Sequence, residues 1–158
     1  DTGCHRILIY NNIPTKNYIG ADIVIGQKDF ESMDDIYIRG GCSYRCIVRE
    51  NNFEMPTSIF VDKQRLYIAD KSHNRILIFN KIPGRNNMSA DVVVGQTNFT
   101  SWVENPLERI GKNTLGYPSG VSSDGKRLYI ADTGNNRILI FNKIPDKNNA
   151  SADIEIFK

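Results

Sequence analysis

The chain has 158 residues, and its 20 lysines and arginines nearly balance its 18 aspartates and glutamates, which leaves a net charge of +2. This balance argues against a nucleic-acid partner, because nucleic acids select strongly basic surfaces. The longest apolar runs hold only a few residues, against about 20 for a membrane-spanning helix, so no membrane insertion is expected.

The sequence of residues 1–14 recurs in similar form at residues 70–83 and again at 132–145. Each copy contains Arg-Ile-Leu-Ile followed by Tyr or Phe. A second β-rich run, which starts with Ala-Asp, follows each copy. The first copy therefore predicts two strands within residues 1–30.

Two further strand-like runs precede each of the later copies. They start with a proline at 56 and at 118, and each leads to the hexapeptide Arg-Leu-Tyr-Ile-Ala-Asp. Short β-branched and aromatic runs bounded by Gly, Pro, Asn and Asp predict antiparallel strands. We therefore expect an all-β chain with these segments: a partial unit at 1–30, a crossover insertion at 31–55, a four-stranded unit at 56–99, a crossover at 100–117 and a four-stranded unit at 118–158.

Four strands per repeat describe a blade of a β-propeller. With the strands labelled A to D from the centre outwards, the chain reads as strands C and D of one blade followed by two complete blades. That makes about two and a half blades.

The third copy carries the most specific pattern. It reads Pro-x-Gly-Val at 118–121 and Asp-Gly-x-x-Leu-Tyr-Ile-Ala-Asp-Thr-Gly-Asn-Asn-Arg-Ile at 124–138, and it closely resembles the NHL repeat. The likeness is looser at 56–76, where Ser58 replaces the glycine. The Gly-Gln pair that closes the fourth strand is similar to that of a bacterial subgroup of NHL-containing proteins. The resemblance implies an NHL-type propeller.

A ring of this family usually has six blades, so this chain is not expected to close one alone. Three interpretations stay open: the sequence is part of a longer chain, it is the visible part of a larger protein, or copies of it complete a ring together. The first two are favoured, because an open ring would expose apolar faces and strand edges. The remaining blades, in cis or from other copies, are therefore expected partners.

Strand direction alternates within a blade, so the B–C turns and the D–A crossovers share one side, which we call the crossover face. The A–B and C–D turns share the opposite side, the hairpin face. Unrepeated loops on a repeat scaffold are where specificity is expected, with aromatic and arginine side chains as contacts. The candidate binding residues are Tyr44, Arg45, Phe53, Trp102 and Arg109. Alternatively, Phe30, Phe99 and Trp102 pack between blades.

Each later B–C turn begins with aspartate and ends with arginine. We expect Asp70 to pair with Arg75, and Asp132 with Arg137, as carboxylate and guanidinium across the turn. Because the pair recurs, whereas an active site needs a unique set of residues, we interpret it as structural.

Three cysteines are expected on the crossover face: Cys4, Cys42 and Cys46. Three interpretations stay open, namely free thiols, a disulfide between two of them, or a metal site with His5. The metal site is the least favoured, because the spacing does not match a zinc finger. A disulfide would fit a periplasmic or secreted protein, so we expect an extracytoplasmic location.

Together these features favour a non-enzymatic scaffold that binds a protein or another macromolecule, without a cofactor or a metal. The alternative is part of a metal-dependent propeller hydrolase or lyase whose site lies in the missing blades. Related enzymes use carboxylates with His or Asn at inner strand ends. The inner strands here offer Asp62 and Asp124 but no histidine, which counts against the enzyme.

Overall fold

The computed structural model describes residues 1–32, 48–102 and 110–157, and it consists almost entirely of strands and turns. The strands form three antiparallel sheets, which we call the first, second and third blades. The first blade pairs β1 (Ile7–Ile9) with β2 (Ile23–Ile25). The second contains β3 (Pro56–Asp62), β4 (Arg65–Asp70), β5 (Arg75–Phe79) and β6 (Val92–Val94). The third contains β7 (Gly120–Ser123), β8 (Leu128–Asp132), β9 (Arg137–Phe141) and β10 (Ile154–Phe157).

The all-β fold with four-stranded antiparallel blades is confirmed. Strands pair in chain order within each sheet, so β3 to β6 and β7 to β10 are strands A to D, and β1 and β2 are C and D. Short 3-10 turns, η1 (Thr2–Cys4) and η3 (Thr133–Asn135), form the B–C turns of the first and third blades. The described strands do not close into a ring. Within the described part of the chain, no helix has the length and apolarity to cross a bilayer.

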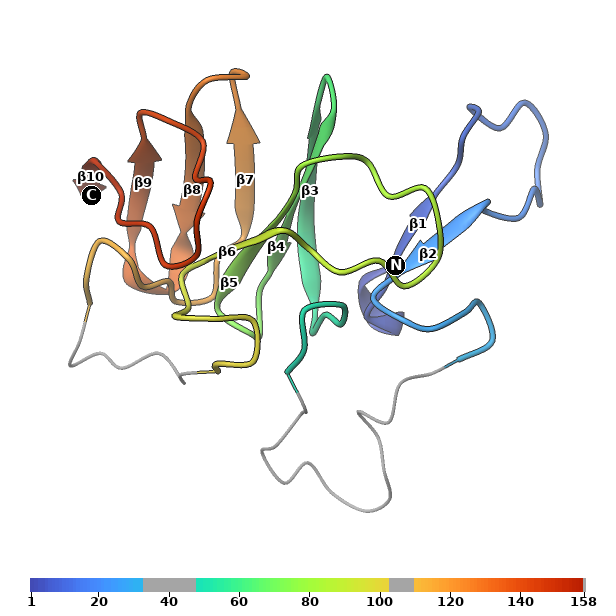
Figure 1. The fold of residues 1–158 in the computed structure, drawn as a ribbon, viewed down its shortest axis with the longest axis horizontal. Coiled ribbons are helices and arrows are strands. Elements are labelled where there is room, and N and C mark those ends of the chain that lie inside the picture. Colours follow the sequence, from blue (N-terminus) through green and yellow to red (C-terminus); the bar gives the residue numbers. More distant parts are fainter. Residues whose placement is uncertain (33–47, 103–109, 158) are drawn as a thin grey trace, which may run out of the picture.

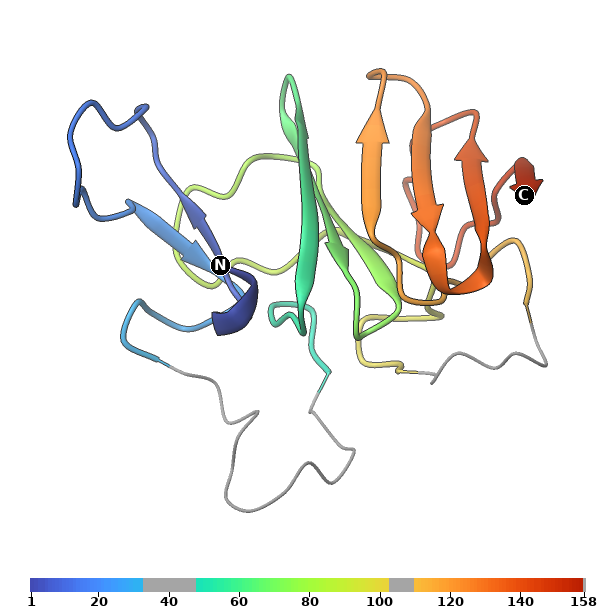
Figure 2. The ribbon, with the colours of Figure 1, turned by 180° about the vertical axis from the view of Figure 1, so that it is seen from behind.

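The three blades lie side by side, with the first and third at opposite ends (Figure 1), and the same order is seen from behind (Figure 2). The hairpin turn between β3 and β4 and that between β7 and β8 lie at the upper side of Figure 1, and the B–C turns lie at the lower side. Two apolar clusters fill the junctions between blades. The repeat therefore builds its core between sheets.

Alternation along the strands sends neighbouring side chains to opposite faces of a blade. In the second blade, all five residues of β5 are buried, because a blade packs on each face. In β9, which has the same sequence Arg-Ile-Leu-Ile-Phe, Ile138 is exposed while Leu139 and Phe141 are buried. The described residues thus cover only one of the two faces of the third blade.

Candidate functional site

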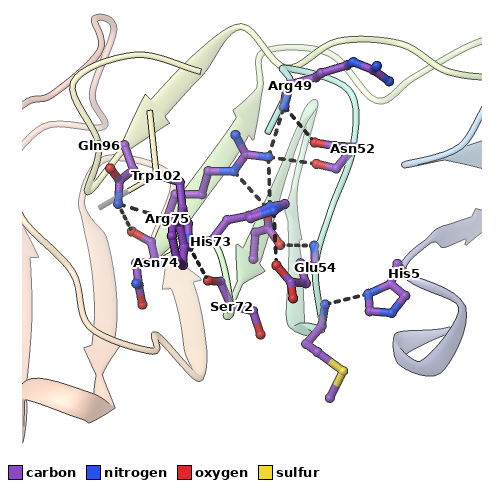
Figure 3. Close-up of polar contacts among 12 residues, drawn as sticks. His5, Arg49, Asn52, Glu54, Ser72, His73, Asn74, Arg75, Gln96 and Trp102 are labelled. Atoms are coloured by element: carbon purple, nitrogen blue, oxygen red, sulfur yellow. Dashed lines mark hydrogen bonds and ion pairs between the residues drawn. The ribbon is translucent and has the colours of Figure 1, made fainter. Parts of the chain in front are cut away.

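The B–C turn of the second blade holds a buried cluster of charges (Figure 3). Asp70 Oδ2 accepts a hydrogen bond from Arg75 Nε at 2.8 Å and lies 2.8 Å from Nδ1 of His73. All three side chains are almost completely buried. Nε2 of His73 lies 3.3 Å from a carboxylate oxygen of Glu54, at ion-pair distance but outside hydrogen-bonding geometry. The Asp70–Arg75 pair expected from the sequence is therefore formed.

Arg75 uses its remaining donors on the backbone of the crossovers. Its terminal nitrogens donate to the carbonyl oxygens of Arg49, Asn52 and Phe99 at 3.0, 2.8 and 2.6 Å. The first two carbonyls belong to the crossover that enters the second blade, and the third belongs to the crossover that leaves it. A single guanidinium therefore fixes both loops, which is a structural task rather than a catalytic one.

The third blade repeats this arrangement. Arg137 Nε donates to Asp132 at 2.7 Å, and its terminal nitrogen donates to the carbonyl oxygens of Gly111 and Thr114, both at 2.8 Å. Its other terminal nitrogen donates to Glu155 at 2.7 Å. The second predicted pair is therefore also formed.

Burial and neighbouring charges shift the pKa of the Asp70 carboxyl group in opposite directions. Burial alone would raise the pKa of its carboxyl group, but the charge and hydrogen bond of His73, with the charge of Arg75, outweigh this effect. The pKa of Asp70 consequently lies below its ordinary value. The aspartate is ionised at neutral pH and serves as the anionic centre of the turn.

A second repeated contact joins the B–C turns of the first and second blades to the blade that follows each of them. His5 and Asn74 have left-handed backbones, with φ of 54° and 53°. Nδ1 of His5 accepts a hydrogen bond from the backbone N–H of Met55 at 3.0 Å, and Oδ1 of Asn74 accepts one from that of Tyr117 at 2.7 Å. Both donors immediately precede the proline at the start of strand A. The contact therefore sets where the next blade begins.

Glycine is required where the D strands of the first and second blades end. Gly95 has a φ of +95°, and a Cβ there would lie 2.6 Å from the side chain of Leu115. Gly26 has the same φ, and its Cβ would overlap the ring of Phe53. Phe53 and Leu115 each stand three residues before a strand-A proline, and both are buried. The prediction that Phe53 is an exposed contact residue is wrong, because its ring packs on the glycine of the preceding blade.

Asparagine pairs in the C–D turns make the third repeated contact. Asn86 Oδ1 accepts from the backbone N–H of Val24 at 3.0 Å, and Asn148 Oδ1 accepts from that of Val93 at 3.0 Å. The following asparagine of each pair donates its backbone N–H to the carbonyl oxygen of the same valine at 3.0 Å. Figure 1 shows the loop between β5 and β6 extending to the first blade. The outer edges of the D strands β2 and β6 are thus each bonded by the C–D turn of the next blade.

Of the other candidate binding residues, only Trp102 lies within the described part of the chain. Trp102 is partly exposed, and its indole N–H donates to the carbonyl oxygen of Ser72 at 3.1 Å. Tyr44, Arg45 and Arg109 lie outside the described residues. As for the alternative packing role, Phe99 packs against the apolar cluster of the first junction, whereas Phe30 is exposed.

Two exposed side chains on the crossover face were missed by the sequence analysis. Met55 and Tyr117 both have positive φ, and their side chains are 41% and 44% exposed. Both residues stand immediately before a strand-A proline, and this shared position could have identified them from the sequence.

Cys4 occupies the turn position that His73 and Asn135 hold in the other blades. It is half-buried and forms no disulfide with the residues that the structure describes. Cys42 and Cys46 fall outside those residues. No group of three His, Cys, Asp or Glu side chains over 1–32, 48–102 and 110–157 is placed to hold a metal ion.

The repeated geometry agrees with the comparison to known families. Residues 115–141, from the buried Leu115 through strand β9, match the family model of the NHL repeat. No curated protein matches the chain. The matched region holds the strand-A proline Pro118 and the Asp132–Arg137 pair. The second blade has the same proline position, at Pro56, and the same pair, Asp70 with Arg75. Residues 115–141 are therefore an NHL repeat.

Proposed function

We propose that this protein is a non-enzymatic binding scaffold that contacts a protein partner through its crossover face. The observation that carries the proposal is that this face holds two kinds of side chain, some engaged in internal contacts and others exposed to solvent. The paired aspartates and arginines of the B–C turns are engaged in internal contacts. Large side chains of the crossovers, among them Met55, Trp102 and Tyr117, are instead exposed to solvent.

These three side chains project from fixed positions. The backbone N–H groups of Met55 and Tyr117 are bonded to the preceding blade, and the indole N–H of Trp102 is bonded to the neighbouring B–C turn. Since an aromatic side chain has only two side-chain torsions, Trp102 and Tyr117 lose little conformational entropy on binding, which favours their use as interface anchors. The scaffold therefore supports contact with an apolar surface rimmed by polar groups.

The predicted contacts Tyr44, Arg45 and Arg109 belong to the same two crossovers and form part of this proposal. An extracytoplasmic location also remains a proposal, supported by the presence of three cysteines in one short chain.

The test is a photo-crosslinking comparison between the two faces. A photoreactive amino acid replaces Tyr117 on the crossover face or Tyr18, which is fully exposed, on the hairpin face. We expect a specific protein adduct from the site at 117 and none from the site at 18. The captured protein is then purified and titrated against the wild-type chain.

The double variant Trp102→Ala, Tyr117→Ala is expected to weaken that complex at least tenfold, while Tyr18→Ala leaves it unchanged. Thermal unfolding shows whether each variant is folded. Equal weakening by the Tyr18 variant, or adducts from position 18 alone, would contradict the crossover face as the binding surface.

A further inference from the structure

The side chain of His73 is enclosed by charged groups from three elements (Figure 3). Its Nδ1 lies 2.8 Å from Oδ2 of Asp70 in β4 and 3.4 Å from a terminal nitrogen of Arg75 in β5. Its Nε2 lies 3.3 Å from a carboxylate oxygen of Glu54, in the crossover that enters the second blade. Among the residues that the structure describes, these are the charged groups that contact His73, which is itself only 1% exposed.

The contacts of this imidazole depend on how many protons it carries. Asp70 is ionised and can only accept, so Nδ1 carries a proton and donates to it. In the neutral imidazole, Nε2 then presents a lone pair to the Glu54 carboxylate and is a buried acceptor without a donor. In the imidazolium, Nε2 carries a second proton and forms an ion pair with Glu54. The observed arrangement therefore suits the doubly protonated form.

The charge balance of the cluster favours the same form. With a singly protonated imidazole, the carboxylates of Asp70 and Glu54 face a single cation, Arg75, and one negative charge is uncompensated. A second proton on His73 supplies the missing positive charge. The side chains of Asp70 and Arg75 are completely buried, whereas that of Glu54 is 27% exposed. Glu54 is therefore the member of the cluster that can turn to water when the imidazole loses a proton.

The third blade shows that the B–C turn does not need such a pair. Asn135 occupies the position of His73 and donates its side-chain N–H to Asp132 at 2.9 Å. Gly116 occupies the position of Glu54, and its backbone N–H donates to Asp132 at 2.6 Å, as the corresponding N–H of the second blade does to its own aspartate. The two turns share these contacts, and the second blade adds a carboxylate that faces a histidine. The added pair has a dependence on pH that the asparagine and glycine of the third blade lack.

Glu54 connects this pair to the crossover face. It immediately precedes Met55, whose side chain is exposed on that face. Its backbone carbonyl accepts a hydrogen bond from the N–H of Ser72 at 3.1 Å, and the carbonyl of Ser72 accepts one from the indole of Trp102 at 3.1 Å. A movement of the carboxylate thus occurs beside the side chains proposed above to bind a partner.

We propose that His73 and Glu54 form a pH-dependent ion pair that controls the exposure of a carboxylate on the crossover face. In weakly acidic solution, His73 carries two protons and holds the carboxylate against the B–C turn. As the pH rises and Nε2 loses its proton, the attraction is lost and the carboxylate turns to solvent, where it adds a negative charge beside Met55. The effect of this charge on partner binding rests on the function proposed above, whereas the ion pair itself does not.

The test follows both side chains by NMR between about pH 5 and 9. The chain has two histidines, so the loss of one imidazole signal in His73→Asn assigns both. This variant matches the third blade, where asparagine stands at the same position and bonds to the aspartate. We expect the ring ¹⁵N shifts of His73 to be those of an imidazolium at about pH 6, and the ¹³Cδ shift of Glu54 to change as the imidazolium disappears. In His73→Asn, that change at Glu54 should be absent.

Two matched variants test whether the Glu54 charge holds the proton. Glu54→Gln keeps the shape and removes the charge, so His73 should bind its second proton roughly threefold to tenfold more weakly. Glu50→Gln removes a charge from the same crossover, but Glu50 is exposed and bonded to Ser89, so His73 should titrate as in the wild type.

Urea unfolding supplies a second readout. The protonated imidazole gains from the carboxylate, whereas the neutral one does not, so the stability that the pair contributes is present at low pH and lost as the pH rises. Glu54→Gln should therefore unfold at lower urea concentration than the wild type at about pH 6, and at nearly the same concentration at about pH 9.

Three results would overturn the proposal: an unchanged His73 titration in Glu54→Gln, an equal shift in Glu50→Gln, or a Glu54 resonance that does not respond as His73 titrates. Because the experiment uses no partner, it is independent of the photo-crosslinking comparison. Absence of an adduct at position 117 would contradict the binding surface and leave the ion pair in place.

Discussion

The second and third blades share two strand sequences, Arg-Leu-Tyr-Ile-Ala-Asp and Arg-Ile-Leu-Ile-Phe, but their environments differ. In the second blade, a neighbouring sheet packs on each face and both strands are almost fully buried. In the third blade, the same residues alternate between buried and partly or fully exposed. Burial in this fold is therefore set by whether a neighbouring blade is present, and it cannot be read from the strand sequence.

The buried ion pairs are the feature that the two blades hold in common, because the side chains of both pairs are completely shielded from solvent. We expect Asp70→Asn and Asp132→Asn each to lower the free energy of unfolding by about 3–5 kcal/mol, since each leaves an arginine buried without its partner. Urea denaturation at neutral pH measures both. Asp146→Asn, at an exposed pair, should leave stability nearly unchanged. A clear loss in only one blade would show that the pairs are not equivalent.

Ile76 in β5 and Ile138 in β9 occupy equivalent positions, and replacing each with alanine should lower the free energy of unfolding by different amounts. Ile76 is completely buried, so Ile76→Ala is expected to cost about 2–4 kcal/mol through lost burial and a cavity. Ile138 is 45% exposed, and Ile138→Ala should cost under about 1 kcal/mol. Chemical denaturation of the two variants measures the difference. Equal costs would mean that a partner covers Ile138 in solution.

Glycines at positive φ test the junction contacts. Gly95→Ala should destabilise the protein by about 2–3 kcal/mol, because the new Cβ meets Leu115 and the backbone at Asn74 in addition to the strained φ. Gly125→Ala, at a φ of +86° with open space around it, should cost only about 1 kcal/mol. Thermal unfolding of both variants gives the comparison, and similar costs would place the whole effect in backbone strain.

The smallest expected difference concerns the tyrosine of the first shared strand. Burial, with the hydrogen bond to Asp62, raises the pKa of Tyr67 to about 12. The bond to Asp124 also raises the pKa of Tyr129 above its ordinary value. As the pH rises above about 10, the tyrosines of the unfolded chain ionise first. Stability should therefore fall from about pH 10 towards 12, chiefly through Tyr67.

Alkaline titration of the tyrosine ¹³Cζ resonances resolves the two side chains. Tyr67→Phe should flatten the loss of stability in this pH range, and Tyr129→Phe should change it less. Ionisation of Tyr67 near pH 10 would contradict the burial that distinguishes the blades.

The sequence predicts features that recur within one repeat. The strand order and the Asp70–Arg75 pair were predictable, because strand-forming runs and a turn of fixed length repeat in each copy. The exposure of Phe53 was predicted wrongly, because its contact with Gly26 joins different blades. An alignment of Phe53 with Leu115, both three residues before a proline, would have revealed its role.

The asparagine pairs of the C–D turns illustrate a second limit. In the sequence they look like ordinary turn formers. Their bonds to Val24 and Val93 depend on how one sheet is placed beside the next, and local sequence does not specify that placement. The repetition of the pair at equivalent positions was the available signal.

The asparagine pairs have a consequence for how such a chain evolves. Each pair belongs to one repeat and bonds to the backbone of a valine in the repeat before it. Its second asparagine also accepts a side-chain hydrogen bond from the crossover that enters its own blade, at Asn51 or Asn113. Because the recognised groups are a backbone N–H and a backbone carbonyl, the side chain of the preceding valine can change without loss of these bonds. A tandem duplication of one repeat thus brings these bonds with it, and they require no change in the side chains of the preceding D strand.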